Sequence, residues 1–547
     1  MIGTDLNDKT APSSLIPRVT AQHVAEQLRT SAELALIDVR DEGVFGRGHL
    51  LFAASIPLAR LEMRARRAIP RLATPVVLIA DDPADADLAA ARLKRGGYLD
   101  LAVLDGGNAA WTKAGYQLFS GVYVPSKAFG EVVEHANHTP RISAADADAA
   151  MRRGDARLYV DSRPIDEFRN FSLPNALDCP GAELVLRAPA AAANTTTPIV
   201  VNCAGRTRSI IGAQSLINAG IPNPVYALEN GAMGWRLSGL ELRHGEDVLV
   251  PLPADADIAL ARRRARALAE KLGAQWIGDA ALQALLAETA HTTYCFDVRL
   301  PEDYAAGHLP GFVNAPGGQL VQSTDVYAPV RNARMVLFDE FGVQAPMTAH
   351  WLRQMGWTVF ILETALAGRA LEKGAQTGPL LYPPDATQRL DVPELMALLR
   401  NNRGILIDCD DSRAFNKQHL RGARWMTRSR IRDIAALTGT VGPHTTIAFT
   451  SEDGVLAQYA AADAAALGLR AAWIAGGTRG GAAATGAVGL TSGPDFLCET
   501  DDAWYSPYQL PAGVEKAMQD YIDWETGLLD RLENEPGLNF KVYVHRS

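Results

Sequence analysis

The sequence predicts an α/β protein in which one domain occurs four times in tandem, each copy a mainly parallel sheet flanked by helices, with a helical tail at the C-terminus. Three observations lead to this fold class. A short apolar strand that ends in Asp-x-Arg recurs along the chain, two further elements follow it each time, and their spacing is constant. Short apolar strands alternate with longer helical stretches, which is the pattern of βαβ units around a parallel sheet.

The three recurring elements can be read directly from the sequence. The Asp-x-Arg strand occurs at 37–40 (IDVR), 160–163 (VDSR) and 296–299 (FDVR), and in a degraded form at 407–410 (IDCD). The second element occurs at 48–50 (GHL), 172–175 (SLPN), 307–311 (GHLPG) and 419–422 (HLRG). The third is a strand of the buried type, at 75–79, 198–202, 335–338 and 446–450. A loop and an alanine- or leucine-rich helix follow each third strand.

The spacing between the first and third elements is the strongest argument for internal repeats. The first loop residue after the third strand lies 42 positions after the Asp in three copies, as Ala80, Cys203 and Asp339. In the fourth copy Ser451 lies 43 positions after the Asp. We therefore predict repeat one over 15–120, repeat two over 137–245, repeat three over 272–375, repeat four over 386–480 and a tail over 493–547.

The composition of the chain excludes several functional classes. A formal net charge of -9 over 547 residues argues against a nucleic-acid partner. The sequence has no apolar run that could span a membrane and no signal-peptide pattern near Met1, so we expect a cytoplasmic protein without membrane contact. The five cysteines are few and scattered, which argues against a disulfide framework and a clustered metal site. We expect no cofactor and no metal.

Two stretches carry a resemblance to a known family. Residues 307–318 (GHLPGFVNAPGG) resemble the first-half signature of rhodanese domains, and residues 161–168 with 203–209 (CAGRTRS) resemble the strand and active loop of the same family. The resemblance covers 15–480 as four copies, and it is strongest in repeats two and three. It implies α/β domains, a persulfide-forming cysteine in a six-residue loop, and a sulfurtransferase of the thiosulfate sulfurtransferase (rhodanese) type.

The residues around Cys203 favour this chemistry independently. The strand over 198–202 brings Cys203 to the carboxyl end of a parallel sheet, where α/β folds place ligands. A helix is expected over 209–219, so the cysteine faces free backbone N–H groups and the positive end of a helix dipole. These features should lower the pKa of the thiol toward neutrality and make Cys203 the catalytic nucleophile.

The rest of the loop is expected to bind the substrate, namely Ala204, Gly205, Arg206, Thr207, Arg208 and Ser209. Gly205 should let the backbone curl so that its amides form an anion nest. Arg206 and Arg208 add positive charge that suits an oxyanion. We expect one of the two arginines to face the substrate, and the sequence does not distinguish them.

The expected reaction moves sulfane sulfur from thiosulfate through a Cys203 persulfide to a thiol or cyanide. Glutathione persulfide and mercaptopyruvate are alternative donors, and a protein is a further candidate acceptor. Phosphatases with a rhodanese-like fold carry an arginine six positions after the cysteine, in a longer loop that fits a phosphate ester. Here Arg208 follows Cys203 by five positions, which favours a sulfur donor.

The other three repeats lack a thiol at the position of Cys203. Ala80 has no nucleophile, Asp339 places a carboxylate where an anion should bind, and Ser451 has no adjacent base. We predict that these repeats are inactive scaffolds, with partner docking or shaping of the Cys203 site as the second interpretation. A non-enzymatic scaffold or redox sensor is the alternative for the whole chain.

Four further cysteines and a tryptophan of interest lie outside the loop. Cys295 and Cys409 are expected in the core, and Cys498 in the tail is left open. Cys179 is a candidate to resolve a persulfide, with packing favoured, and Trp235 is a candidate pocket wall or core residue. The linkers 121–136 and 246–271 and the aromatic tail carry apolar residues. We therefore expect the repeats to pack as one rigid body with the site near a seam; the oligomeric state stays open.

Overall fold

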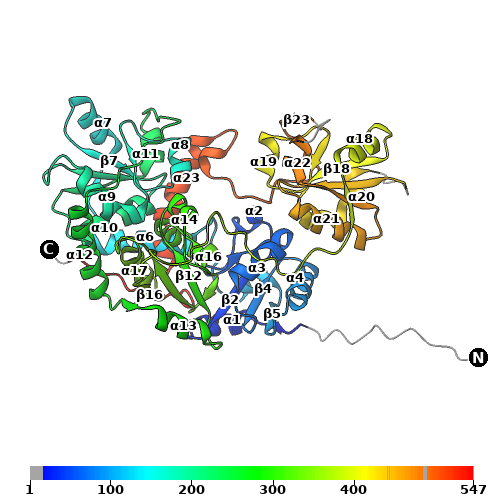
Figure 1. Ribbon diagram of the computed structural model, residues 1–547, viewed down its shortest axis with the longest axis horizontal. Helices are drawn as coiled ribbons and strands as arrows, with labels where there is room; N and C mark the ends of the chain where they lie inside the picture. The colour runs from blue at the N-terminus through cyan, green and yellow to red at the C-terminus, as the bar shows by residue number, and fades with distance from the viewer. Residues whose placement is uncertain (1–15, 440–441, 443, 484–488, 546–547) are drawn as a thin grey trace, which may run out of the picture.

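The structure is a computed structural model that describes residues 16–439, 442, 444–483 and 489–545. Its strands form four larger sheets, one in each repeat, and a separate antiparallel pair, with helices on both sides of the sheets (Figure 1). This arrangement confirms the predicted fold class. Residues 1–15, which include most of the region assessed for a signal peptide, and the end of the predicted tail lie outside the described residues. In the described part no helix is long and apolar enough to cross a membrane.

Repeats one and two have nearly the same series of elements. Repeat one contains β1 (Arg18–Val19), α1 (Ala21–Leu28), β2 (Leu34–Asp38), α2 (Glu42–Phe45), β3 (Ala54–Ser55), η1 (Leu58–Arg60), α3 (Leu61–Ala68), β4 (Val76–Ile79), α4 (Pro83–Arg95), β5 (Leu101–Leu104) and α5 (Gly107–Lys113). Repeat two contains β6 (Arg141–Ile142), α7 (Ala144–Arg153), β7 (Leu158–Asp161), α8 (Ile165–Asn170), β8 (Leu177–Asp178), η2 (Gly181–Glu183), α9 (Leu184–Ala191), β9 (Ile199–Asn202), α10 (Thr207–Asn218), β10 (Val225–Leu228) and α11 (Gly231–Leu237).

Repeats three and four follow the same scheme with local changes. Repeat three contains β11 (Gln275–Ile277), α13 (Asp279–Ala287), β12 (Thr293–Asp297), α14 (Pro301–Ala306), β13 (Val313–Asn314), α15 (Gly317–Gln322), α16 (Thr324–Tyr327), β14 (Val330–Arg331), β15 (Arg334–Phe338), α17 (Gln344–Gln354) and β16 (Thr358–Leu362). Repeat four contains β17 (Gln388–Leu390), α18 (Val392–Arg400), β18 (Gly404–Asp408), α19 (Ser412–Lys417), β19 (His419–Leu420), β20 (Ala423–Trp425), η3 (Arg428–Asp433), α20 (Ile434–Thr438), β21 (Thr446–Thr450), α21 (Val455–Ala466), β22 (Ala471–Ile474) and α22 (Gly477–Ala483). Strand β23 (Leu490–Thr491) pairs with β19 in the antiparallel sheet.

The linkers and the tail are mainly helical. Helix α6 (Val124–Asn137) joins repeats one and two, and α12 (Asp255–Lys271) joins repeats two and three. The tail forms η4 (Pro507–Gln509), α23 (Val514–Thr526) and η5 (Leu529–Arg531). Ile258, Ala265 and Leu268 of α12 are buried, whereas Leu260 is 37% exposed.

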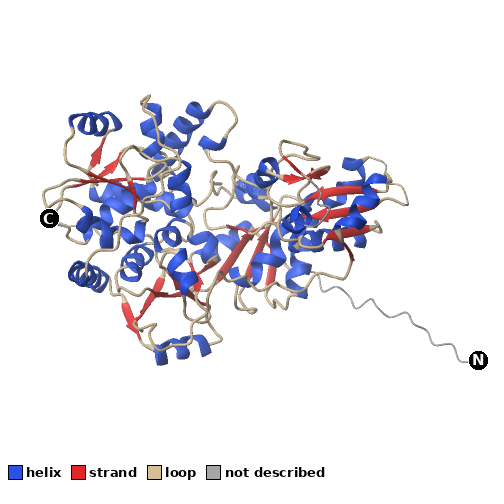
Figure 2. Cartoon of the chain, turned by 45° about the horizontal axis from the view of Figure 1, so that its top comes forward, coloured by secondary structure: helices blue, strands red, loops and turns tan. Residues whose placement is uncertain are grey.

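The four sheets share one strand order, and this explains the constant spacing in the sequence. The orders are β1-β5-β4-β2-β3, β6-β10-β9-β7-β8, β11-β16-β15-β12-β13 and β17-β22-β21-β18-β20. Figure 2 shows the strands of these sheets between their flanking helices. In each sheet the strand that ends in the repeated Asp runs parallel to the strand before the loop, so Asp161 lies beside Asn202 and Asp297 beside Phe338. In every repeat the residue that follows the second of these two strands is therefore the first residue of the loop.

The repeated Asp-x-Arg element is a buried ion pair that closes the end of its strand. In repeat two, Arg163 donates to both oxygens of Asp161, with Nε 2.9 Å from Oδ1 and Nη2 2.8 Å from Oδ2. Arg299 pairs with Asp297 in the same way. These arginines also donate to a carbonyl in or next to the second repeated element, such as that of Gly307 at 2.8 Å. One buried network therefore ties the two elements together.

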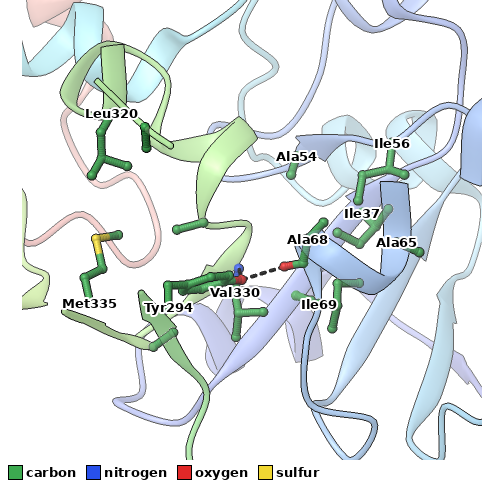
Figure 3. Packing of buried hydrophobic residues seen from close by; sticks show 14 of the residues in the cluster. Ile37, Ala54, Ile56, Ala65, Ala68, Ile69, Tyr294, Leu320, Val330 and Met335 are labelled. Carbon is green, nitrogen blue, oxygen red and sulfur yellow. Dashed lines mark hydrogen bonds between the residues drawn. The ribbon is translucent and has the colours of Figure 1, made fainter. Parts of the chain in front are cut away.

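Repeats one and three share a hydrophobic core. Strand β14 of repeat three pairs antiparallel with β2 of repeat one, so it extends the sheet of repeat one. Figure 3 shows Tyr294 of repeat three reaching Ala68, with its hydroxyl 2.5 Å from the carbonyl oxygen, beside Ile37, Ile69 and Val330. Shared burial of this kind favours a fixed orientation of the two repeats.

Repeat four is joined to repeat one mainly by charged side chains. Arg428 of η3 donates to the Glu62 carboxylate at 2.7 and 3.0 Å. Arg92 reaches Asp463 at 2.9 Å, and Arg60 reaches Asp410 at the same distance. Arg428 and Glu62 are both buried, and each has a second partner, since Arg428 also pairs with Asp463 at 2.8 Å and Glu62 with Arg92 at 3.2 Å.

Candidate active site

Cys203 follows β9 and lies immediately before the start of a helix, as the sequence predicts. Helix α10 begins at Thr207, two residues earlier than expected, with Arg206 at its N-cap. The Cys203 side chain is 2% exposed. Ser209, in the first turn of α10, directs its backbone N–H to the sulfur, while its hydroxyl donates to the carbonyl of Arg206 at 2.7 Å.

The backbone carbonyls of the loop are turned toward α11. The N–H of Ala232 donates to the Cys203 carbonyl at 2.8 Å, and the N–H of Met233 donates to the Ala204 carbonyl at 2.9 Å. In a trans peptide the carbonyl and the following N–H point in opposite directions, so the amides that follow these carbonyls point away from α11. Gly231 has a φ of +54° and permits this approach, since a Cβ there would lie 2.4 Å from the Cys203 oxygen.

The thiol of Cys203 is less acidic than the sequence led us to expect. Burial raises its pKa, and this effect outweighs the positive charge of Arg208 and the hydrogen bond from the Ser209 N–H, which lower it. Glu525 adds a negative charge that raises the pKa further. The expected lowering toward neutrality is therefore wrong for this structure, because the sequence pattern does not reveal how deeply the loop is buried.

Both arginines of the loop are paired with carboxylates. Arg208 binds Glu167 through two hydrogen bonds of 2.8 Å and lies 3.2 Å from Gln319 of repeat three. Arg206 binds Glu131 of α6 through two hydrogen bonds of 2.8 Å and also contacts Glu134. Arg208 is the arginine whose charge acts on the sulfur, whereas Arg206 ties the loop to α6.

A cavity of about 310 Å³ lies in front of Cys203, and all parts of the chain contribute to it. Repeat two supplies the loop from Cys203 to Arg208, with Glu167 and Met233. The other contributors are Glu42 of repeat one, Val122, Tyr123 and Lys127 at the first linker, Gln319, Gln322 and Ser323 of repeat three, Arg413 of repeat four, and Trp504, Ser506, Pro507, Tyr508, Gln509, Tyr521 and Glu525 of the tail. The cavity is therefore formed between domains, at the seam.

The tail contacts the loop directly. The Thr207 hydroxyl donates to the Glu525 carboxylate. A Cβ on Gly205 would lie 3.2 Å from Glu525 Oε2 and from Tyr521 Cε1, so glycine allows α23 to approach the loop. Gly205 was expected to curl the backbone, but it is not among the residues with positive φ. Its small size is thus the property that the structure uses.

The loops of repeats three and four hold their own polar atoms at the place of the Cys203 sulfur. Asp339 Oδ2 accepts from the backbone N–H groups of Val343 at 2.8 Å and Gln344 at 3.1 Å. Ser451 Oγ accepts from the N–H of Ala457 at 3.2 Å, six positions later, as Ser209 follows Cys203. The common geometry is a cradle for an electron-rich atom at this position.

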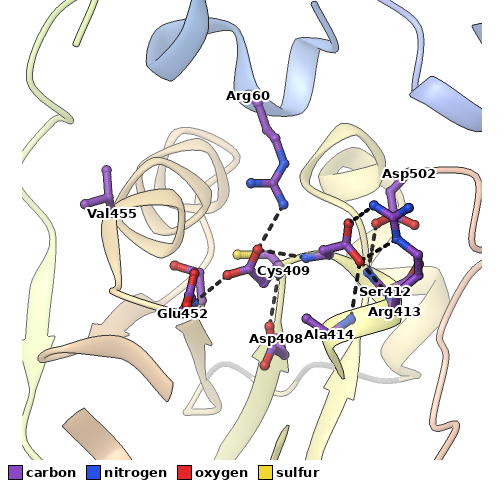
Figure 4. A network of polar contacts seen from close by, with 12 residues as sticks. Arg60, Asp408, Cys409, Ser412, Arg413, Ala414, Glu452, Val455 and Asp502 are labelled. Carbon is purple, nitrogen blue, oxygen red and sulfur yellow. Dashed lines mark hydrogen bonds and ion pairs between the residues drawn. The ribbon is translucent and has the colours of Figure 1, made fainter. Parts of the chain in front are cut away.

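Repeat four also loses the Asp-x-Arg ion pair. Asp408 has no arginine partner two positions later, and burial raises its pKa to about 7. Figure 4 shows the rearranged network, in which Arg413 pairs with Asp411 and the backbone N–H of Ser412 bonds Asp502 of the tail. The tail therefore takes part in the polar network at this end of repeat four.

The structure places several residues outside the loop that the sequence did not assign to the site or left open. Lys127, Tyr521 and Glu525 line the cavity but lie outside the repeats. Of these, Lys127 carries a signal in the sequence, because it is a lone lysine on the apolar helix α6. Cys179 is fully buried in a core cluster and does not line the cavity. Trp235 is likewise a core residue, and its indole N–H donates to the backbone carbonyl of Glu241. Cys295 and Cys409 are buried in the core as predicted.

Comparison with families and solved structures identifies related proteins. The rhodanese-like domain matches residues 20–114, 143–238 and 279–368, which lie within repeats one, two and three. The crystal structure of a thiosulfate sulfurtransferase from Pseudomonas aeruginosa is 41% identical in sequence, with a TM-score of 0.93, and the match covers 96% of this chain and 100% of that chain. The limits proposed for the four repeats stay predictions.

Other solved structures have a lower sequence identity to this chain and a lower TM-score. EanB is 14% identical with a TM-score of 0.23, over 66% of this chain and 98% of its own. A Bacillus halodurans protein is 18% identical with a TM-score of 0.18, over 22% of this chain and 87% of its own. No curated protein matches the sequence. Similarity over the full length is thus found with the Pseudomonas aeruginosa enzyme.

Proposed function

The chain belongs to the rhodanese-like family of sulfurtransferases, and on this basis we propose that it carries sulfane sulfur from thiosulfate to a thiol or cyanide through a persulfide on Cys203. The observation that carries this proposal is the position of Cys203 at the end of β9, where the Ser209 N–H and the charge of Arg208 favour the thiolate and the loop carbonyls turn toward α11. The similarity to a thiosulfate sulfurtransferase along the whole chain supports thiosulfate as donor.

The proposed reaction has two displacements. In the first, the Cys203 thiolate attacks the outer sulfur of thiosulfate, the sulfur–sulfur bond breaks, and sulfite leaves with the electron pair. In the second, an acceptor thiolate or cyanide attacks the outer sulfur of the persulfide, and the Cys203 thiolate leaves. Such a double displacement gives ping-pong kinetics.

The loop has a defined role in both steps. The hydrogen bond from the Ser209 N–H and the charge of Arg208 stabilise negative charge on the sulfur. The amides that point away from α11 are available to the oxygens of an anionic donor and to the persulfide. The Asp339 carboxylate occupies the corresponding cradle in repeat three, which supports an affinity of this loop geometry for anions.

Intact-mass measurement after incubation with thiosulfate tests the proposal. The wild type should gain the mass of one sulfur atom, lose it again on addition of a thiol, and release sulfite in equal amount. Cys203→Ser should show none of these changes, while Cys179→Ser should behave as wild type. Full sulfur transfer by Cys203→Ser would show that another thiol carries the reaction.

Two other interpretations are separated by the same measurement. Glutathione persulfide or mercaptopyruvate as donor predicts that loading of Cys203 is faster with those compounds than with thiosulfate. A scaffold or redox sensor predicts no stable persulfide with any donor, and instead oxidation of Cys203 by peroxide. The three repeats without a thiol at the loop position give this second interpretation its basis.

A further inference from the structure

The cations that line the cavity differ in whether a carboxylate already neutralises them. Arg206 is paired with Glu131 and Arg208 with Glu167. Arg413 is paired with Asp411, at 2.6 Å. The loop arginines that the sequence offered as anion-binding groups are thus committed to internal partners, and their charge is largely compensated.

Lys127 is the exception among these cations. It lies on α6 and is 3% exposed, and within the described residues its ammonium group has no ion pair or hydrogen bond. Four aromatic rings surround it instead, with centroids at 5.9 Å (Tyr123), 5.5 Å (Trp504), 4.9 Å (Tyr521) and 5.0 Å (Trp524). Cation–π contacts hold an ammonium group in place without neutralising its charge or using its hydrogen-bond donors in ion pairs. Lys127 is therefore free to bind an anion in the cavity.

The cavity is larger than an inorganic donor requires. Its volume of about 310 Å³ falls in the range of sites for small organic molecules. Lys127 belongs to the linker and not to the loop, and Arg208 and Glu525, not Lys127, are the charges that act most on the sulfur. A ligand that reaches both Cys203 and Lys127 needs a reactive end and a separate anionic end.

The charges near Lys127 leave its ammonium group able to pair with an incoming anion. Burial lowers the pKa of Lys127 to about 8, and the carboxylates of Glu525 and Asp325 oppose this by raising it. Glu525 also faces the loop, where its Oε2 has no hydrogen-bond partner in the described residues. The ammonium form of Lys127 therefore prevails at neutral pH, and a ligand carboxylate can pair with it while the sulfur end of the ligand lies toward Cys203.

We propose that Lys127 is a specificity-determining residue that binds the carboxylate of a small organic thiol, the acceptor of the sulfur carried by Cys203. This inference rests on the proposed function, because it names the acceptor class of the same site. The acceptor thiolate attacks the outer sulfur of the persulfide, a new sulfur–sulfur bond forms, and the Cys203 thiolate leaves with the electron pair. No oxidant or further reactant is needed.

Binding of an unreactive analogue tests the inference apart from catalysis. The probe is 3-(methylthio)propionate, titrated calorimetrically into the full-length protein. We expect Lys127→Met to bind it at least about tenfold more weakly than wild type, since a charge-assisted hydrogen bond is lost. Lys127→Arg should bind it better than Lys127→Met, and Lys516→Met, at an exposed lysine of the tail helix α23, should match wild type. Equal affinity of wild type and Lys127→Met would overturn the inference.

Discharge of a preformed persulfide gives the second readout. With 3-mercaptopropionate as acceptor, Lys127→Met should raise KM about tenfold or more, while KM for the uncharged 2-mercaptoethanol stays within about twofold. Equal losses with both thiols would assign Lys127 a purely structural role, and thermal unfolding shows whether the variant is folded. Failure of thiosulfate to load wild-type Cys203 would refute the proposed function, and the calorimetric comparison would still decide whether Lys127 binds the carboxylate.

Discussion

The hydroxyl of Thr207 donates a hydrogen bond to the carboxylate of Glu525, and this contact joins the loop of repeat two to a helix 318 positions further along the chain. Both side chains are buried. The other carboxylate oxygen of Glu525 faces Gly205 and has no partner in the described residues. A residue outside all four repeats thereby places a negative charge beside the candidate nucleophile, and it disfavours the thiolate.

Glu525→Gln should therefore make Cys203 more acidic. The substitution removes a charge that raises the pKa of the thiol, while the amide oxygen of Gln can still accept from Thr207. We expect the pKa of Cys203 to fall, so that alkylation at a given pH becomes faster. The pH dependence of alkylation by iodoacetamide, followed by intact mass, measures it. Glu515→Gln, at an exposed position of the same helix, is the matched control. An unchanged or higher pKa in Glu525→Gln would contradict this account.

The same assay should give different results for variants of the two loop arginines. Arg208→Ala removes the charge that most lowers the pKa of Cys203, so the pKa should rise and alkylation at neutral pH should slow. Arg206→Ala should leave the pH profile nearly unchanged, because Arg206 is absent from the main influences on the thiol. Equal shifts in both variants would show that the arginines act together.

Arg206→Ala should instead destabilise the protein. It leaves the buried carboxylate of Glu131 without its partner, next to Glu134. Loss of one partner of a buried ion pair costs about 3–5 kcal/mol, which a lower midpoint of thermal unfolding would report. Arg236→Ala, at an exposed ion pair of α11, should change the midpoint little. A midpoint equal to that of wild type would mean that the link between the loop and α6 contributes little.

The fold could be predicted from the sequence because its repeats are local and regular. The Asp-x-Arg strand and the strand before the loop are paired in every copy, and this pairing fixes the spacing between Asp161 and Cys203. Cys203 was found because the strand end, the loop and the helix start are contiguous in sequence. The start of α10 was placed two residues late, because Thr207 and Arg208 carry no strong capping signal.

The walls of the cavity could not be predicted in the same way. Lys127 and Glu525 reach the cavity in front of Cys203 only through packing of the linker and the tail onto repeat two, and no short-range pattern encodes this. The pKa of the Cys203 thiol depends on the same packing, so the sequence alone could not predict whether it is raised or lowered. The pairing of Arg206 with Glu131 is a further long-range contact of this kind.

The loop of repeat three gives a test of the cradle without catalysis. Asp339 accepts from two backbone N–H groups of its loop, and Asp339→Ala leaves these donors without an acceptor. We expect a loss of about 1–3 kcal/mol in unfolding free energy, measured by urea denaturation. Asp339→Asn, which keeps an oxygen acceptor, should lose less. Glu340→Ala, at an exposed neighbour, should have little effect. Similar stability of Asp339→Ala and wild type would show that the cradle does not favour a bound carboxylate.

Asp178 of repeat two and Asn314 of repeat three occupy the same position of their sheets. Asp178 pairs with Asp161, as Asn314 pairs with Asp297. The Asn314 amide donates to the carbonyls of Asp297 at 3.2 Å and Arg299 at 3.1 Å. Asp178 is fully buried, and neither of its carboxylate oxygens has a hydrogen-bond partner in the described residues. A carboxylate cannot donate, so only the protonated form of Asp178 can make the bonds that Asn314 makes.

Asp178→Asn should therefore stabilise the protein at alkaline pH and have little effect at acidic pH. The pKa of Asp178 is raised to about 8, mainly by burial and next by the negative charge of Asp161. Because this value lies above that of an unfolded Asp, about 4, the contribution of Asp178 to stability is complete below pH ~4 and is lost as the pH rises to about 8. Asparagine does not titrate, so the variant should exceed wild type by about 1–3 kcal/mol at pH ~8.5, and the difference should shrink toward pH ~5. Urea denaturation at the two pH values measures this, with Asp166→Asn at an exposed site as control. A difference that is the same at both pH values would mean that Asp178 keeps its charge state across this range.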